Sequence, residues 1–271
     1  MLRFDRAAMR IGLLASLLTL AGGLNTPRGA FNLAVSPASL QLTVKPGRTV
    51  KGTILVTGET DRPLRITSSV GDWNLDPKGS LLFLAAGRLQ RSLAAWLKVS
   101  PAQFTLSRGR PQVIRYQLSV PAGVAGSYWG VLFFQTEPLG GIPAGATGIR
   151  TAARLTTMMY THTERGGTIG GEIDGLGAKY RPNGQLDLRA DLRNLGTLIF
   201  KPGGWFELQE QQSGKIAAKA AVEPVTVLPG GNREIIGAWQ GKLAPGKYVP
   251  VLHLRQGGWK IALTGAALVV P

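Results

Sequence analysis

The sequence predicts an all-β protein built from two tandem β-sandwich domains that follow an N-terminal signal peptide. Three observations lead to this prediction: apolar residues alternate with period two, single glycines and prolines recur as turn signals, and one stretch of sequence occurs twice. The 271 residues include 37 glycines and 17 prolines, and 44% are hydrophobic while 17% are charged. This composition is too apolar for a disordered chain and is sufficient to build packed cores.

The alternation is clearest in two segments. In residues 113–120 every second side chain is large and apolar, and in residues 186–193 apolar residues alternate strictly with charged ones. Such a pattern places one face of a strand in a core and the other in solvent, as in antiparallel sheets, whereas a helix would mix the faces. Turn sequences separate the runs, for example Lys-Pro-Gly at 45–47 and Pro-Asn-Gly at 182–184. Their spacing is typical of sandwiches.

The repeated stretch predicts the number of sandwiches. Tyr128 follows Gly-Ser and precedes an apolar run to Phe134, and Tyr248 follows Pro-Gly-Lys and precedes an apolar run to Leu254. In immunoglobulin-like sandwiches a tyrosine near the start of the penultimate strand donates its hydroxyl to nearby backbone. We interpret Tyr128 and Tyr248 as two such tyrosine corners, so the sequence predicts two tandem immunoglobulin-like sandwiches.

The N-terminal residues are expected to direct export. Arg3, Arg6 and Arg10 precede an apolar run over residues 11–21, which is followed by two glycines. This order is typical of a cleavable signal peptide, although an uncleaved anchor is the alternative. The run is shorter than the roughly 20 residues that a bilayer requires, and no later stretch is long enough and free of charge. We therefore expect an exported mature chain without a transmembrane span.

The predicted domain boundaries follow the glycine-containing stretches. Residues 1–30 form the signal peptide and leader, residues 31–165 the first immunoglobulin-like domain, and residues 166–271 the second. The segment 139–148 lacks bulky side chains. We expect it to be a long loop before the last strand of the first domain.

Charge restricts the classes of partner. The chain has 31 Lys and Arg against 15 Asp and Glu, a formal net charge of +16. Outside the cytoplasm such a charge favours acidic glycans, wall polymers or lipid headgroups more than nucleic acid. The basic residues are scattered, without a run of five or a nucleic-acid-binding signature, so no nucleic-acid partner is expected and a solvated basic surface is the simpler interpretation.

The inventory of reactive residues does not predict an enzyme. The chain has no cysteine, and its only histidines are His162 and His253, so neither a thiolate nucleophile nor a multi-histidine metal site can form. Asp187 and Asp191 alternate with arginines on one strand face, which indicates cross-strand ion pairs more than an acid–base pair. We expect a non-catalytic protein that needs no cofactor and no metal.

Several short motifs follow one another between residues 92 and 128. They are Ser-Leu and Trp-Leu within 92–97, Ser-Pro-Ala-Gln-Phe-Thr-Leu at 100–106, Gln-Val-Ile-Arg-Tyr at 112–116, Val-Pro at 120–121 and Gly-Ser-Tyr at 126–128. In this order they resemble the first domain of periplasmic pilus-assembly chaperones. The resemblance covers about residues 33–163, and the second sandwich matches the two-domain plan of that family. The block is also similar to wall-associated surface proteins of Gram-positive bacteria that carry related sandwich domains.

The resemblance implies that the chain lends an edge strand to an incomplete immunoglobulin-like subunit. In strand addition, main-chain hydrogen bonds supply affinity and alternating apolar side chains fill the groove of the client. The predicted donor is the last strand of the first domain, within residues 149–160. The side chains expected to contact a partner are Ile149, Arg150, Ala153, Arg154, Leu155 and Met159.

One feature of the family is missing. Its members hold the terminal carboxylate of the client with an arginine in the first strand and a lysine in the last strand of the first domain. The aligned positions here are Ser39 and Thr157, which carry no charge, while Arg150 and Arg154 lie nearby in sequence.

The expected function is therefore protein binding, chaperone-like and non-catalytic, in the periplasm or at the cell surface of a bacterium. The expected partner is an exported client or an envelope protein. The alternative is a structural or adhesive surface module that docks on acidic glycans or wall polymers through its basic surface.

Overall fold

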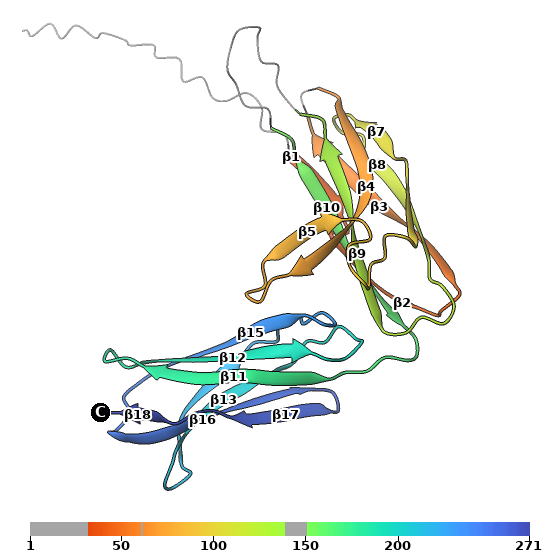
Figure 1. Cartoon of the computed structure of the whole chain (residues 1–271). Coiled ribbons are helices and arrows are strands. Elements are labelled where there is room, and N and C mark those ends of the chain that lie inside the picture. Colours follow the sequence, from red (N-terminus) through yellow and green to blue (C-terminus); the bar gives the residue numbers. More distant parts are fainter. Residues whose placement is uncertain (1–31, 61, 139–150) are drawn as a thin grey trace, which may run out of the picture. The chain divides into compact units, whose positions relative to one another are not determined.

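A computed structural model describes residues 32–60, 62–138 and 151–271, and its regular elements are all strands (Figure 1). Within these ranges no helix has the length and apolar character of a membrane span. The expected signal peptide, the expected loop at 139–148, Ile149 and Arg150 lie outside the described residues. The all-β prediction is confirmed.

The first sandwich contains strands β1 to β10. Their bounds are β1 Asn32–Ser36, β2 Ser39–Val44, β3 Thr49–Glu59, β4 Leu64–Leu75, β5 Leu81–Ala85, β6 Leu97–Ser100, β7 Gln103–Leu106, β8 Gln112–Ser119, β9 Ser127–Thr136 and β10 Arg154–Thr163. One sheet has the order β1-β3-β8-β6, and the other has the order β2-β10-β9-β4-β5, with β7 also paired to β4.

The second sandwich contains strands β11 to β18. Their bounds are β11 Gly171–Tyr180, β12 Gln185–Asn194, β13 Gly203–Glu210, β14 Ile216–Val222, β15 Asn232–Gln240, β16 Gly246–Gln256, β17 Trp259–Thr264 and β18 Leu268–Val270. Its sheets have the orders β11-β12-β15 and β14-β13-β16-β17, with β18 also paired to β16. Each sandwich has its own buried apolar cluster, so the prediction of two immunoglobulin-like sandwiches is confirmed.

The alternating segments form strands with the predicted inward faces. Ile114, Leu118, Leu186 and Leu192 are each at most 1% exposed, while the charged residues between Leu186 and Leu192 lie on the other face. Apolar side chains at every second position can bury against the facing sheet without burying charge. Gly184 closes the turn before the second of these strands with φ +85°, a conformation that glycine adopts without steric penalty.

The first strand of the first sandwich changes sheets at Pro37. Leu33 and Val35 belong to β1, which pairs antiparallel with β3, and Leu40 and Leu42 belong to β2, which pairs parallel with β10. The four side chains pack against the same core from the two opposing sheets. Proline cannot donate a ladder hydrogen bond, so it is well placed between the two halves.

Strand β9 is buried on both faces. Leu132 and Phe134 point into the first core, whereas Trp129, Val131 and Phe133 point the other way and are at most 8% exposed. These last three form, with Trp73 of β4, what we call the outer apolar layer. The indole N–H of Trp129 donates to the carbonyl of Trp73 at 2.8 Å, so the polar atom of the buried ring is satisfied.

The two predicted tyrosine corners differ. The hydroxyl of Tyr248 donates to the carbonyl oxygen of Ala244 at 2.8 Å, which is the upstream backbone bond of a corner. The Tyr128 hydroxyl has no hydrogen-bond partner among the described residues, so the prediction of a corner there is corrected. Its ring instead packs against Trp96, with 4.5 Å between ring centroids, and the Arg91 guanidinium lies 5.2 Å from the ring centroid.

Candidate partner-binding edge

Strand β10, the predicted donor, is covered on one side along its length and on the other side for half of it. It pairs antiparallel with β9 from Arg154 to His162. Its parallel partner β2 begins opposite Met158, where Ser39 is the matching residue. In the part of the chain that the structure describes, Arg154 to Thr157 therefore have a neighbouring strand on one side only.

The direction of the backbone groups follows from one hydrogen bond. The N–H of Met158 donates to the carbonyl of Ala38 at 2.9 Å, which places the backbone groups of Met158 on the β2 side. Successive residues of a strand direct their backbone groups to opposite edges, so every second residue faces the same edge. Arg154 and Thr156 therefore direct their N–H and C=O groups toward the side where β2 does not extend.

The end of this uncovered stretch is marked by Thr157. Its hydroxyl donates to the carbonyl of Pro37 at 2.9 Å, and the residue is fully buried. Ser39 and Thr157, the positions aligned with the charged anchors of the chaperones, thus lie on neighbouring strands. Neither supplies a positive charge at this place.

The predicted contact residues within the described part of the chain differ in burial. Leu155 is half-buried and packs against the edge of the first core. Ala153 is also half-buried, and its backbone exchanges hydrogen bonds with Thr136 through that residue's hydroxyl and N–H. Met159 is fully buried. Because β2 covers the second half of β10, Met159 is a core residue, and we correct its assignment as a partner contact.

Arg154 faces away from the core. Its Nε donates to the side-chain oxygen of Gln135 at 2.8 Å, and its guanidinium carbon lies 5.0 Å from the ring centroid of Phe133. The side chain therefore covers the outer apolar layer and leaves the backbone edge of β10 open. The Arg154 side chain therefore covers one face of β10 and does not cover the backbone N–H and C=O groups at its edge.

A second uncovered edge lies beside the first. Among the described residues, strand β1 ends its sheet, pairs only with β3, and contacts β10 across the sandwich. Leu33 and Val35 of β1 are half-buried against the same core as Leu155. We call the open side formed by β1 and Arg154 to Thr157 the seam. The sequence interpretation overlooked β1, although Pro37 between two alternating runs was the available signal.

His162 has a structural role. The Ser127 hydroxyl lies 2.7 Å from Nδ1 of His162 and accepts the N–H of Ile199 at 2.8 Å. Burial lowers the pKa of His162 below its ordinary value, which favours the neutral ring that can accept the serine proton. Ser127 is fully buried, so its hydroxyl is occupied by this junction and does not face solvent as a nucleophile would.

His253 belongs to a polar and aromatic cluster on the second sandwich. Its ring stacks on Trp205 with 4.9 Å between centroids, and its Nε2 lies 3.4 Å from the Glu207 carboxylate. Burial raises the pKa of Glu207, but hydrogen bonds from Trp205 and Gln209 together with the charges of His253 and Lys219 outweigh it and hold that pKa below its ordinary value. Among the described residues no group of three or more His, Cys, Asp or Glu is placed to hold a metal ion.

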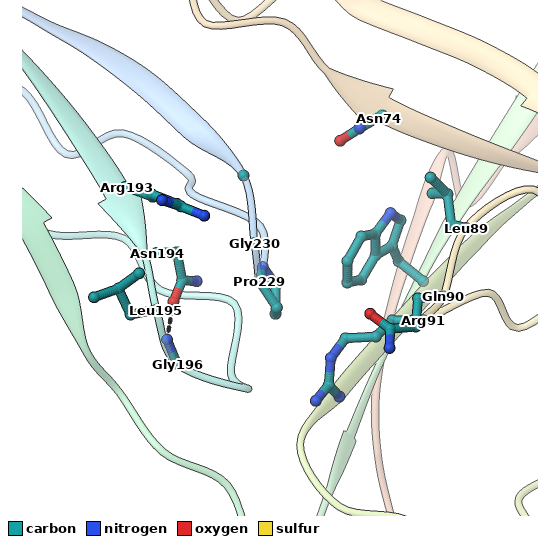
Figure 2. A pocket seen from close by; sticks show the side chains of 12 residues that line it. Asn74, Leu89, Gln90, Arg91, Arg193, Asn194, Leu195, Gly196, Pro229 and Gly230 are labelled. Carbon is teal, nitrogen blue, oxygen red and sulfur yellow. Dashed lines mark hydrogen bonds between the residues drawn. The ribbon is translucent and has the colours of Figure 1, made fainter.

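A hollow of about 500 Å³ is lined by single residues from within the ranges 74–129 and 193–231 (Figure 2). Most of its polar side chains already bind backbone. Arg91 donates to the carbonyls of Ala125 and Ser127, and the Asn194 amide donates to two carbonyls while its oxygen accepts the N–H of Gly196. The hollow is therefore a weaker candidate for partner recognition than the seam, where no described residue pairs with the outward backbone groups of Arg154 and Thr156.

Comparisons with known proteins give matches of structure only. No protein-family model matches the sequence, and the search of curated proteins gives no match. Solved structures of periplasmic pilus-assembly chaperones match most of the chain. The class 5 fimbriae chaperone CfaA is 11% identical with a TM-score of 0.45, over 88% of this chain and 100% of that chain. The E. coli chaperone DraB is 14% identical with a TM-score of 0.40, over 89% and 98%. The Salmonella enterica chaperone SafB, in a complex with the pilin SafA, is 11% identical with a TM-score of 0.40, over 89% and 97%.

Proposed function

We propose that this chain is an exported, non-catalytic, chaperone-like protein that binds an incomplete β-sandwich client by adding the free part of β10 to the client's sheet. The observation that carries the proposal is the seam. Within residues 32–60, 62–138 and 151–271 no strand covers the two edges there, and Leu33, Val35 and Leu155 are half-buried beside them. A partner strand placed in the seam would pair with backbone and bury these side chains together.

The expected affinity comes mainly from backbone groups. Arg154 and Thr156 together offer two N–H donors and two C=O acceptors toward the seam, each worth about 1 kcal/mol net when paired. Leu155 lies between them and supplies apolar contact, with about 25 cal/mol for each Å² of surface removed from water. Such a site is weak for a short peptide, and it favours a client that also presents a groove for Leu33 and Val35.

The proposal includes the predicted organisation of the chain. Residues 1–30 act as a cleaved export signal, and the domain boundary lies near residue 166, between the end of β10 and the start of β11. The site of action is the cell envelope. The mass of the mature protein checks the first point, because a chain that retains Met1 would contradict cleavage.

Thr156→Pro is the sharpest test of strand addition. Proline removes the N–H that points into the seam and leaves the β9 ladder intact, since edge strands tolerate proline where the N–H faces outward. We expect the variant to lose most client binding in a pull-down from an envelope extract of the native host, with bound proteins identified by mass spectrometry.

Thr156→Ala is the matched control, because it removes the same side chain and keeps the N–H. It should bind the client as the wild type does, and both variants should melt within a few degrees of it. Leu155→Arg should also abolish binding while the domain stays folded. Unchanged binding by Thr156→Pro would move the function to another surface, and unfolding by Leu155→Arg would show that this leucine is ordinary core.

A second candidate function is docking on acidic polymers, and one sheet face favours it. Lys51 of β3 and Lys98 of β6 both lie opposite Gln117 of β8, and Arg115 lies two residues before Gln117 on the same face. No carboxylate among the described residues forms an ion pair with these three cations. Polymer docking should weaken steeply as salt rises, whereas strand addition should hardly change. Lys51→Gln with Arg115→Gln should affect only the salt-sensitive binding.

A further inference from the structure

Strand β5 is an exposed apolar strand at one end of the sheet β2-β10-β9-β4-β5, which also contains β10. All five of its residues are exposed, and Leu81, Leu82, Phe83 and Leu84 expose 46%, 47%, 42% and 37% of their surface. The strand pairs with β4 and ends the sheet order, so its second edge has no strand beside it among the described residues. Soluble proteins rarely expose contiguous apolar side chains without a partner.

Nothing within β5 protects this edge. Natural edge strands carry a charge, a proline or a bulge that discourages pairing with another chain. The sequence Leu-Leu-Phe-Leu-Ala has no charge and no proline, and its register against β4 is regular. Lys78 and Arg88, the nearest basic residues on either side, lie outside the strand.

Both faces of β5 are apolar. Phe83 lies opposite Trp73 and thus shares the face of the outer apolar layer, where its ring meets Phe133 with 5.3 Å between centroids. Leu82 and Leu84 point to the opposite face. A strand added to β5 would therefore extend the outer apolar layer on one face and cover two leucines on the other.

The charges that flank β5 distinguish between possible occupants. Lys78 and Arg88 are both exposed, and Asp76, the nearest acid in sequence, accepts the N–H of Ser80 within its own turn. A second copy, paired antiparallel about Phe83, would bring Lys78 of one molecule opposite Arg88 of the other. The full sequence has a formal net charge of +16, so each copy is strongly basic. Self-pairing is therefore repulsive, whereas a strand with acidic ends is complementary.

We infer that β5 is a docking strand for an extended segment of another protein, in which about five apolar or β-branched residues lie between acidic ends. A five-residue strand is much smaller than the roughly 800 Å² per partner of a stable interface. The flanking ion pairs must therefore supply part of the affinity and the choice of partner. This site is separate from the seam and does not depend on it.

Two fluorescent peptides test the inference against the full mature chain. The acidic-ended peptide is Asp-Glu-Val-Thr-Val-Thr-Val-Asp-Glu, and the control replaces its four acids by lysine. In fluorescence anisotropy we expect the acidic-ended peptide to bind at least about tenfold more tightly, and to weaken several-fold between about 50 and 300 mM salt. Equal binding of the two peptides would overturn the inference.

Variants of the chain locate the site. Leu82→Lys with Leu84→Lys should lose at least about tenfold in affinity, while Ile236→Lys, at a residue of β15 that is 56% exposed, should bind as the wild type does. Thr156→Pro should also bind normally, which separates this site from the seam. Unchanged binding by the Leu82 and Leu84 variant would contradict the assignment.

Reversing the two charges that flank β5 tests the same site without changing a residue of the strand. Lys78→Glu with Arg88→Glu leaves β5 untouched and should invert the preference, so that the lysine-ended peptide binds more tightly. Sedimentation of the chain alone should show a monomer. A dimer that disappears in the Leu82 and Leu84 variant would assign β5 to a second copy and overturn the inference of another protein.

Discussion

Strands β9 and β16 contain the two tyrosines of the sequence repeat, Tyr128 and Tyr248, so their residues can be compared one by one. Leu132 of β9 corresponds to Leu252 of β16, and both are fully buried. On the opposite face Phe133 corresponds to His253. Phe133 is 8% exposed within the outer apolar layer, whereas His253 lies in a half-exposed polar cluster.

The difference shows that the two sandwiches use the same strand for different purposes. In the second sandwich β16 lies between β13 and β17, and its outer face carries the half-exposed His253. In the first, β9 supports a further apolar layer that continues to the exposed strand β5. The sequence contains this distinction, because residues 129–134 read Trp-Gly-Val-Leu-Phe-Phe without alternation, a pattern of strands buried on both faces.

The largest expected loss of stability comes from a substitution in the outer apolar layer. Phe133→Ala should lower the free energy of unfolding by about 3 kcal/mol, because a buried ring is removed and a cavity remains. His253→Ala, the corresponding change in β16, should lower it by less than about 1 kcal/mol, since that ring is partly in solvent. Urea denaturation measures both. Equal losses would mean that the two outer faces are equivalent.

The two tyrosines should respond differently to loss of the hydroxyl. Tyr248→Phe removes the hydrogen bond to Ala244 and should lower stability by about 1 kcal/mol. Tyr128→Phe should change stability very little, because its hydroxyl has no partner among the described residues. Alanine at either position should remove about 3 kcal/mol through lost ring packing. A similar loss for both Phe variants would restore Tyr128 as a corner.

Acid should weaken the junction at His162. The folded state lowers the pKa of His162 by burial below its ordinary 6.5, so the unfolded chain binds a proton more readily. The stability that this residue contributes is present above about pH 6.5 and is lost as pH falls toward the lowered pKa. The urea midpoint of the wild type should therefore drop more between pH 7.5 and 5.5 than that of His162→Asn. Parallel curves would contradict the burial effect.

The smallest expected effect concerns Arg154. Replacing it with methionine keeps an apolar cover over Phe133 but removes the cation–π contact and the bond to Gln135. The expected loss is about 0.5 kcal/mol, with Arg115→Met as an exposed control that should be silent. A loss similar to that of Phe133→Ala would indicate that Arg154 anchors the layer and does not merely cover it.

The sequence predicted the faces of strands better than their neighbours. Alternation correctly identified Ile114 and Leu186 as inward, because it depends only on local geometry. It could not reveal that β2 lies beside β10, since that pairing joins residues far apart in sequence, and Met159 was therefore expected at an edge. Strand β5 is the opposite case, because its composition resembles that of a buried strand although its residues are exposed.

The pairing of β2 with β10 also has a consequence for the time at which the first sandwich can form. The hydroxyl of Thr157 bonds to Pro37, a residue 120 positions earlier. Closing so long a loop is entropically unfavourable and makes sheet formation slow. A chain that is synthesised from its N-terminus cannot place β2 beside β10 until β10 has been made. During that interval the half-finished domain exposes its own core strands, so the protein itself would need protection from aggregation until its last strand arrives.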